Sequence, residues 1–311
     1  MRCAPWIFWK PRYTGSSGGW PVFFPAPALA RIPVAGRRQR NAPGRELRHN
    51  SPMGGESFSS LFINHGAPAL PLGTSVARRF LEDLGRRIPR PRAIVVVCPQ
   101  WQAPHFQIRA PRRFQARASS KAAGAGDGLL SELRYEPRGD TDLATRAQSM
   151  LGSAGLAVEV LEDDRLDAGA WVPLMLMYPQ ADIPLIQISL AQGGPAALYA
   201  AGRALRPLTL NEVLLVGAGG FVEHRVAPQE EDAATIEWAM VFEDWVEEHL
   251  LSGDWPTLLN WRKLAPMPEA APANDQHLLP LFFAGGAGGE TRRLHRSFVH
   301  GSVSQATYGF L

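Results

Sequence analysis

The chain has 311 residues, of which 45% are hydrophobic, and this suits one large or two small domains with a buried core. No run of 18 consecutive apolar residues occurs, which argues against a membrane-spanning helix. The only cysteines, Cys3 and Cys98, do not form the pattern of a disulfide framework or a zinc knuckle. Cys98 ends an apolar run that predicts a buried strand, so its thiol is expected to be inert. We therefore expect a protein of a reducing, cytoplasmic compartment that does not act in a membrane.

The positive charge is concentrated at the N-terminus. Residues 1–56 contain 9 of the 32 Lys and Arg residues, against two acidic residues, Glu46 and Glu56. Residues 57–311 then carry 23 basic and 27 acidic residues, although the pI of the whole chain is about 9.1. The sequence therefore predicts no nucleic-acid-binding face on the folded part.

Residues 1–56 contain many Pro, Gly and Arg residues and show no helical or strand periodicity. This composition predicts a disordered basic leader, followed by one domain over 57–311. No apolar stretch of the kind found in a secretory signal follows the basic start. Two explanations for the leader remain open, a targeting segment or translation that begins at Met53, and we favour the second.

From residue 60 onward, apolar runs alternate with helical patterns. Strands are predicted at 60–64, 93–98, 157–161, 184–190, 213–216 and 307–311. Helices are predicted at 75–84 with Gly85 as a stop, and at 142–151, 196–205, 232–251 and 277–284. Residues 121–130 are rich in Gly and Ala and predict a mobile loop. The alternation predicts a single α/β domain with a central, mostly parallel or mixed sheet flanked by helices.

In such sheets, sites lie beyond the carboxyl ends of the strands. The candidate segments after predicted strands are His65, residues 99–101 and residues 217–224. His65 is the strongest single candidate, although on its position alone a structural histidine held by backbone hydrogen bonds in a tight turn is the favoured explanation. Residues 217–220 (GAGG) lack the Lys-Ser/Thr of a phosphate-binding loop, so a nucleotide site is not expected. His277 begins a helical pattern, and capping or packing is its simplest explanation.

Five strings, taken in order, resemble the class III extradiol ring-cleavage dioxygenases, most closely the DOPA 4,5-dioxygenase branch. They are LFINHGAP (61–68), LDAGAWVPL (166–174), MYPQADIP (177–184), GAGG (217–220) and HLLPL (277–281). The resemblance implies a LigB-like α/β fold. It also implies a non-haem Fe(II) or Zn(II) ion, a small catechol-type aromatic substrate and O₂ as the partners. It assigns His65 and His277 as metal ligands.

The sequence departs from the family pattern at four site positions. Gln100 stands where the family has a metal-binding histidine before tryptophan, and Ala168 stands where it has a histidine near the substrate. Glu223 replaces a histidine after the Gly-rich strand, and His224 follows one residue late. Residues 271–272 (Ala-Pro) replace a His-Pro pair. Losing a metal ligand weakens metal binding, and losing a proton-transfer group slows the reaction about 10²–10⁴-fold.

Three functions remain open at this stage. The first is a working dioxygenase with a rearranged site, in which Glu223 completes a two-histidine, one-carboxylate set and His224 is the catalytic base. The second is a catalytically inactive homologue that binds a small aromatic or acidic ligand through Gln100, Trp101 and Arg225. The third is a different chemistry in the same pocket. The sequence predicts no oligomeric state.

Overall fold

The computed structural model describes residues 57–65, 70–116, 132–221, 233–266 and 276–311. The predicted leader and the predicted loop at 121–130 lie outside these residues. Residues Pro52–Leu311 form one compact unit. Among the described residues, no helix has both the length and the apolar character needed to cross a bilayer.

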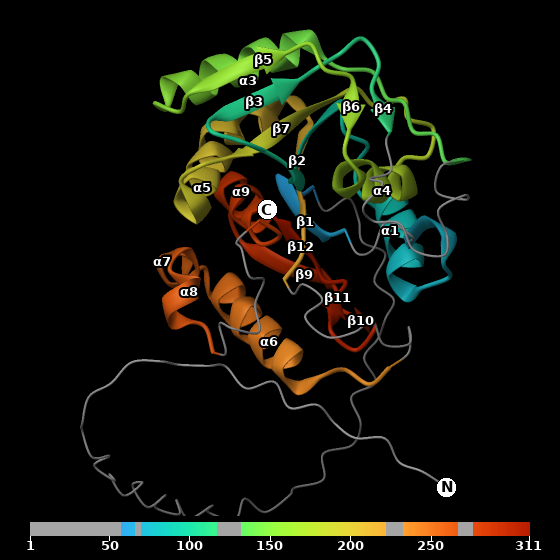
Figure 1. Ribbon diagram of the computed structural model, residues 1–311, viewed down its shortest axis with the longest axis vertical. Coiled ribbons are helices and arrows are strands. Elements are labelled where there is room, and N and C mark those ends of the chain that lie inside the picture. The colour runs from blue at the N-terminus through green and yellow to red at the C-terminus, as the bar shows by residue number, and fades with distance from the viewer. Residues whose placement is uncertain (1–56, 66–69, 117–131, 222–232, 267–275) are drawn as a thin grey trace, which may run out of the picture. The chain divides into compact units, whose positions relative to one another are not determined.

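The centre of the fold is an eight-stranded mixed sheet in the order β5-β3-β7-β2-β8-β1-β12-β9 (Figure 1). Its strands are β1 (Ser60–Asn64), β2 (Ala93–Ala103), β3 (Phe106–Arg109), β5 (Val158–Leu161), β7 (Leu185–Ala191), β8 (Val213–Gly219), β9 (Thr291–His295) and β12 (Thr307–Phe310). The central strands β7, β2, β8 and β1 are parallel, whereas β12 and β9 add antiparallel pairs. Two small sheets pair β4 (Gln115–Ala116) with β6 (Arg165–Leu166) and β10 (Phe298–Val299) with β11 (Val303–Ser304). The predicted mixed α/β sheet is confirmed.

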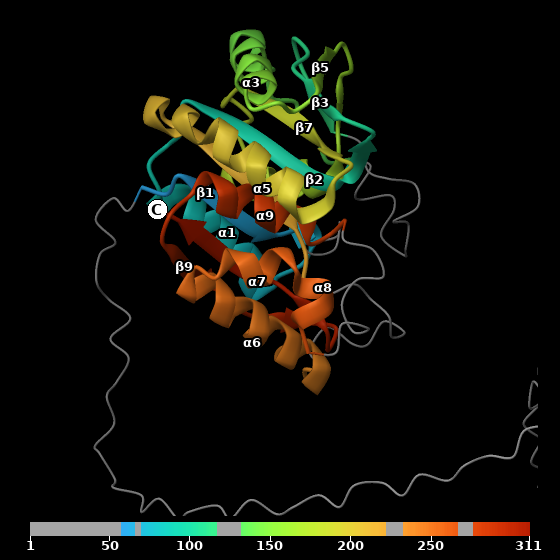
Figure 2. The same cartoon turned by 90° about the vertical axis from the view of Figure 1, so that its left-hand side faces the viewer.

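Helices cover both faces of this sheet, as Figures 1 and 2 show. They are α1 (Val76–Arg87), α3 (Thr141–Ser153), α4 (Ala168–Met177), α5 (Gly194–Leu205), α6 (Glu237–Ser252), α7 (Trp255–Leu259), α8 (Trp261–Leu264) and α9 (Leu279–Ala287), with 3₁₀ turns at Leu70–Leu72 and Arg206–Asn211. Alternate side chains of each strand enter opposite cores. Phe62 belongs to the core formed with α3, α5, α6 and α9, whereas Leu61 and Ile63 belong to the core formed with α1 and α4.

The predicted strands and helices all occur, but several details of the prediction were wrong. Gly85 does not stop a helix, because α1 continues to Arg87. The predicted strand at 93–98 continues to Ala103, so residues 99–101 lie inside β2 and not after it. His277 lies in the turn before α9 and is not its first residue. The helix predicted from residue 232 begins at Glu237.

Candidate active site

The structure brings His65 and His277 together, although they are 212 positions apart in the sequence. Their ring centroids lie 5.6 Å apart at an interplanar angle of 46°. His65 directly follows β1, and its backbone N–H donates a hydrogen bond to the carbonyl of Gly219 at 3.0 Å. The N–H of Gly220 donates to the carbonyl of His277 at 2.7 Å. The end of β8 thus holds both histidines through backbone bonds.

The Gly-rich end of β8 allows this close approach. A Cβ atom on Gly219 would overlap the carbonyl of His277, and one on Gly217 would overlap the carbonyl of Pro280 at the start of α9. Any larger residue at these positions would push α9 and the His277 turn away from the sheet. The glycines therefore serve packing around the histidine pair.

The end of β2 contributes Gln100 from a bulge. In the pairing with β7, Val97 faces Ile188 and Gln102 faces Leu190, so the residues between Val97 and Gln102 bulge out of the ladder. Bulges of this kind re-aim side chains and are frequent beside active sites. The Oε1 atom of Gln100 lies 2.3 Å from the position that a Cβ of Gly169 would take, so the Gln100 amide packs against the first turn of α4.

The β2 end also contacts the segment that carries His277. Gln276 Nε2 donates a hydrogen bond to Gln102 Oε1 at 2.9 Å. Ala168, the first residue of α4, is buried, and its methyl group can neither bind a metal nor transfer a proton. Gln100 and Ala168 therefore lie at the same edge of the sheet as the histidine pair, as the sequence predicted.

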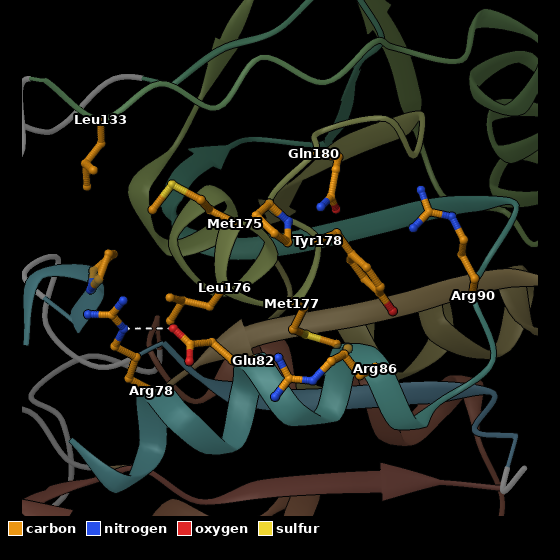
Figure 3. Close-up of a pocket in the computed structure, with 13 residues that line it drawn as sticks. Arg78, Glu82, Arg86, Arg90, Leu133, Met175, Leu176, Met177, Tyr178 and Gln180 are labelled. Carbon is orange, nitrogen blue, oxygen red and sulfur yellow. Dashed lines mark hydrogen bonds and ion pairs between the residues drawn. The ribbon is translucent and has the colours of Figure 1, made fainter. Parts of the chain in front are cut away.

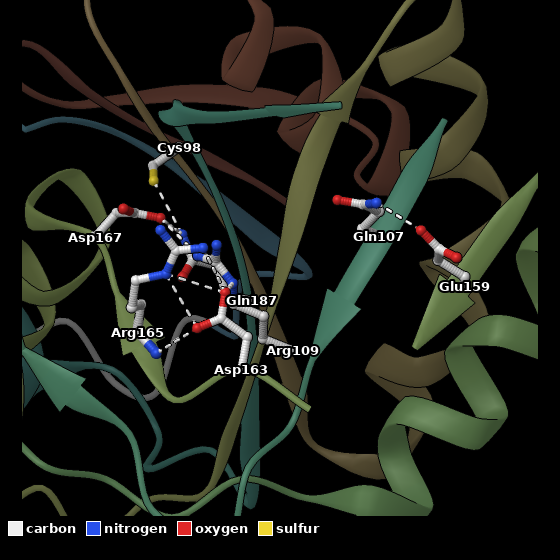
Figure 4. Close-up of polar contacts among 8 residues, drawn as sticks. All are labelled: Cys98, Gln107, Arg109, Glu159, Asp163, Arg165, Asp167 and Gln187. Atoms are coloured by element: carbon white, nitrogen blue, oxygen red, sulfur yellow. Dashed lines mark hydrogen bonds and ion pairs between the residues drawn. The ribbon is translucent and has the colours of Figure 1, made fainter. Parts of the chain in front are cut away.

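A buried polar network, which the sequence did not reveal, lies behind this edge (Figure 4). Arg109 is 2% exposed and contacts Asp163 at 2.8 Å and Asp167 at 3.0 Å. Gln187 Nε2 donates to Asp167 Oδ2 at 2.8 Å and lies 3.3 Å from the sulfur of Cys98. Opposite charges balance within the network, which is the condition under which a buried arginine is tolerated.

Two pKa shifts follow from this environment. Hydrogen bonds from Arg165, together with the nearby charge of Arg109, lower the pKa of Asp163 to about 2, so it is ionised at neutral pH. Burial raises the pKa of the Cys98 thiol well above its usual range, with a further contribution from the charge of Asp167. A neutral, buried thiol is a poor nucleophile and a poor metal ligand, which agrees with the expectation of an inert cysteine.

The histidine pair fits two ligands of a shared metal ion. A ligating nitrogen lies about 2.1 Å from the metal and about 1.1 Å from its own ring centroid, so two rings on one ion have centroids no more than about 6.4 Å apart. The observed 5.6 Å satisfies this limit. Across the described residues, no group of three or more His, Cys, Asp or Glu side chains with metal-binding spacing occurs. Glu223, His224 and Arg225, and residues 271–272, lie outside these residues.

A separate cavity of about 540 Å³ lies between α1 and the end of α4 (Figure 3). Arg78, Arg86 and Arg90 line it together with Met175 and Tyr178. Each of these arginines forms an ion pair with a carboxylate: Arg78 with Glu82, Arg86 with Asp83, and Arg90 with Asp182. None of the site residues predicted from the sequence lines this cavity, so we do not assign the activity to it.

Comparisons with known proteins agree with the geometry. Residues 71–311 match the family model described as "Catalytic LigB subunit of aromatic ring-opening dioxygenase". The chain is 31% identical over 257 residues to "4,5-DOPA dioxygenase extradiol" of Mirabilis jalapa, covering 80% of this chain and 95% of that one. It is 29% identical to the Escherichia coli protein of the same name, covering 76% of this chain and 87% of that one.

A solved structure gives the same picture. The crystal structure of an uncharacterized protein from Escherichia coli K12 matches with a TM-score of 0.67 and 25% identity, covering 81% of this chain and 99% of the other. The family model spans most of the chain and includes His277. This chain therefore belongs to the family of class III extradiol, LigB-type aromatic ring-opening dioxygenases.

Proposed function

We propose that this protein is a metal-dependent dioxygenase that opens catechol-type aromatic rings and binds its metal through His65 and His277. The observation that carries the proposal is the 5.6 Å separation of the two rings at the carboxyl edge of the sheet. Family membership supports the reaction class, and relatives named "4,5-DOPA dioxygenase extradiol" make L-DOPA the first substrate to test.

The two histidines have different attachments to the same strand end. The backbone of His65 is hydrogen-bonded to Gly219, and that of His277 to Gly220. Both imidazoles are therefore attached to backbone that is held in place. Neutral imidazole is a good ligand for Fe(II) and Zn(II). When bound, Fe(II) supplies a common site for the catechol oxygens and O₂. We assign Glu223 as the third ligand and His224 as the base that takes a catechol proton, both on the sequence pattern alone.

A second function is favoured by one observation. Gln100 and Ala168 occupy positions where the resemblance places histidines, and the Gln100 amide packs on α4. An inactive homologue that binds a small aromatic or acidic ligand fits these substitutions. The structure corrects one part of this hypothesis, because Trp101 is only 8% exposed and Arg109 covers one face of its ring. Trp101 therefore offers little surface to a ligand.

The test is anaerobic Fe(II) titration followed by oxygen uptake with L-DOPA. We expect one metal per chain in the wild-type protein, and we expect His65→Ala and His277→Ala each to weaken metal binding by more than the about 10–100-fold that loss of an outer-shell partner costs, and to abolish uptake. His105→Ala is the control, because the His105 side chain is 40% exposed and pairs with Glu159. A wild-type protein without stoichiometric metal contradicts the proposal. Thermal stabilisation by an aromatic acid but not by metal would support the second function.

A further inference from the structure

Arg109 covers the β2 bulge. The Cζ atom of its guanidinium lies 3.6 Å from the ring centroid of Trp101, in stacking contact. Both residues are almost fully buried. A cation stacked on an indole in a desolvated place is strongly held. Because Trp101 directly follows Gln100, this stack fixes one end of the bulge that presents Gln100.

The same guanidinium holds the start of α4. Arg109 Nη1 contacts Asp167 Oδ2 at 3.0 Å, and Asp167 is the N-cap residue immediately before Ala168. Gln187, the cross-strand neighbour of Arg109 on β7, donates to the same carboxylate oxygen at 2.8 Å. Figure 4 shows the Arg109 guanidinium between the side chains of Asp163 and Asp167. One buried cation thus links β2 with the first turn of α4.

These two segments meet directly at the candidate site, where Gln100 packs on Gly169. We propose that Arg109 is a positioning residue, which holds the β2 bulge and the first turn of α4 at a fixed separation beside His65 and His277. The effect of this positioning on catalysis rests on the proposed function. Only a planar guanidinium can stack on Trp101 and bind two carboxylates at once, and a lysine ammonium cannot do this.

The test compares Arg109→Lys with the wild-type protein in the full-length chain, by hydrogen exchange and by Zn²⁺ binding. We expect exchange in peptides covering 98–103 and 166–171 to become about fivefold faster or more, with 60–64 and 279–287 unchanged. We also expect the Kd for Zn²⁺ to rise about tenfold. Arg165→Lys is the matched control. The exposed Arg165 side chain directs its hydrogen bonds to Asp163 at the outer side of the same network, so neither readout is expected to change.

Unchanged exchange in both segments would overturn the positioning role, and so would equal acceleration throughout the sheet, which indicates global destabilisation. If Arg109→Lys does not fold, Trp101→Leu removes the stack and leaves the ion pairs of Arg109. Faster exchange in 98–103 then supports the role, and unchanged exchange overturns it. If the wild-type protein binds no metal and takes up no oxygen, the proposed function fails, while the exchange data still decide the role of Arg109.

Discussion

At the scale of single residues, the position of Gln100 shows how two of the substitutions relative to the family pattern are related in space. Its amide lies on the first turn of α4, which begins at Ala168, so two of the substituted positions are neighbours in space. The two substitutions are therefore best reversed together.

We expect the double variant Gln100→His with Ala168→His to bind Zn²⁺ or Fe(II) at least about tenfold more tightly, a change of about 1.4 kcal/mol. The reason is that imidazole replaces a neutral amide at the sheet edge that carries His65 and His277. Isothermal titration under anaerobic conditions measures this. Gln180→His, in the exposed turn after α4, is the control for an added histidine. An unchanged affinity in the double variant would mean that residue 100 does not face the metal position.

Glu243 is a buried carboxyl group whose titration makes stability depend on pH. This α6 residue is fully buried beside Arg296, Glu247 and Ser304, and burial raises its pKa from 4.5 to about 7. The folded protein therefore holds a proton that the unfolded chain releases, and stability falls as the pH rises from about 4.5 to about 7. A pKa shift of this size corresponds to a loss on the order of 3 kcal/mol in the free energy of unfolding over this pH range.

Urea unfolding at pH 5 and pH 8 tests this. We expect Glu243→Gln to be more stable relative to wild type at pH 8 than at pH 5, by about 1–3 kcal/mol. The control Glu248→Gln, exposed on the same helix, is expected to follow the wild-type pH profile. Parallel profiles of Glu243→Gln and wild type would show that Glu243 titrates at its ordinary pKa in the folded state.

At the scale of elements, Gly85 shows how packing overrides a local signal. A glycine after a helical pattern usually marks a C-terminus, yet α1 runs through it. The reason is tertiary, since a Cβ on Gly85 would overlap the carbonyl of Met177 at the end of α4. The glycine allows α1 and α4 to touch along their backbones.

We expect Gly85→Ala to lower the free energy of unfolding by at least about 1 kcal/mol, because overpacking costs more than the helix propensity of alanine returns. Gly152→Ala in α3 is the matched control, since no atom lies within 4 Å of a new Cβ there. That variant should gain about 0.5–1 kcal/mol. Chemical denaturation measures both. Equal stabilisation by the two alanines would mean that α1 and α4 can separate at no cost.

The elements that the sequence predicted are those with a continuous apolar run or a clear helical period. Strand β1 was predicted because all its residues are buried, and helix α3 because its buried residues recur at helical spacing. Helix α4 was missed because it is apolar on every side and contains Pro173, so no amphipathic period exists. The Arg109 network was also missed. From the sequence, an arginine in a strand is expected to be exposed. Only the fold brings Arg109 together with the carboxylates that allow its burial.

At the scale of the whole molecule, the strand order explains why distant residues form one site. Strand β8 lies between β2 and β1, and the turn before α9 crosses its end. From the sequence, His65 and His277 could be assigned to one site only through the family resemblance. No local pattern links residues that are so far apart. The metal roles of both histidines remain predictions, and the segment with Glu223 and His224 lies outside the described residues.

Truncation tests whether residues 1–52 contribute to the fold. All described residues belong to the unit Pro52–Leu311, and the excess positive charge belongs to the segment before it. We expect a chain that begins at Met53 to unfold within about 2 °C of the full-length protein, because it keeps every contact of the core. Its retention on a cation exchanger should fall, because 9 basic residues are lost with only one acidic residue. A melting temperature lowered by more than about 5 °C would instead show that the N-terminal segment contributes to the fold.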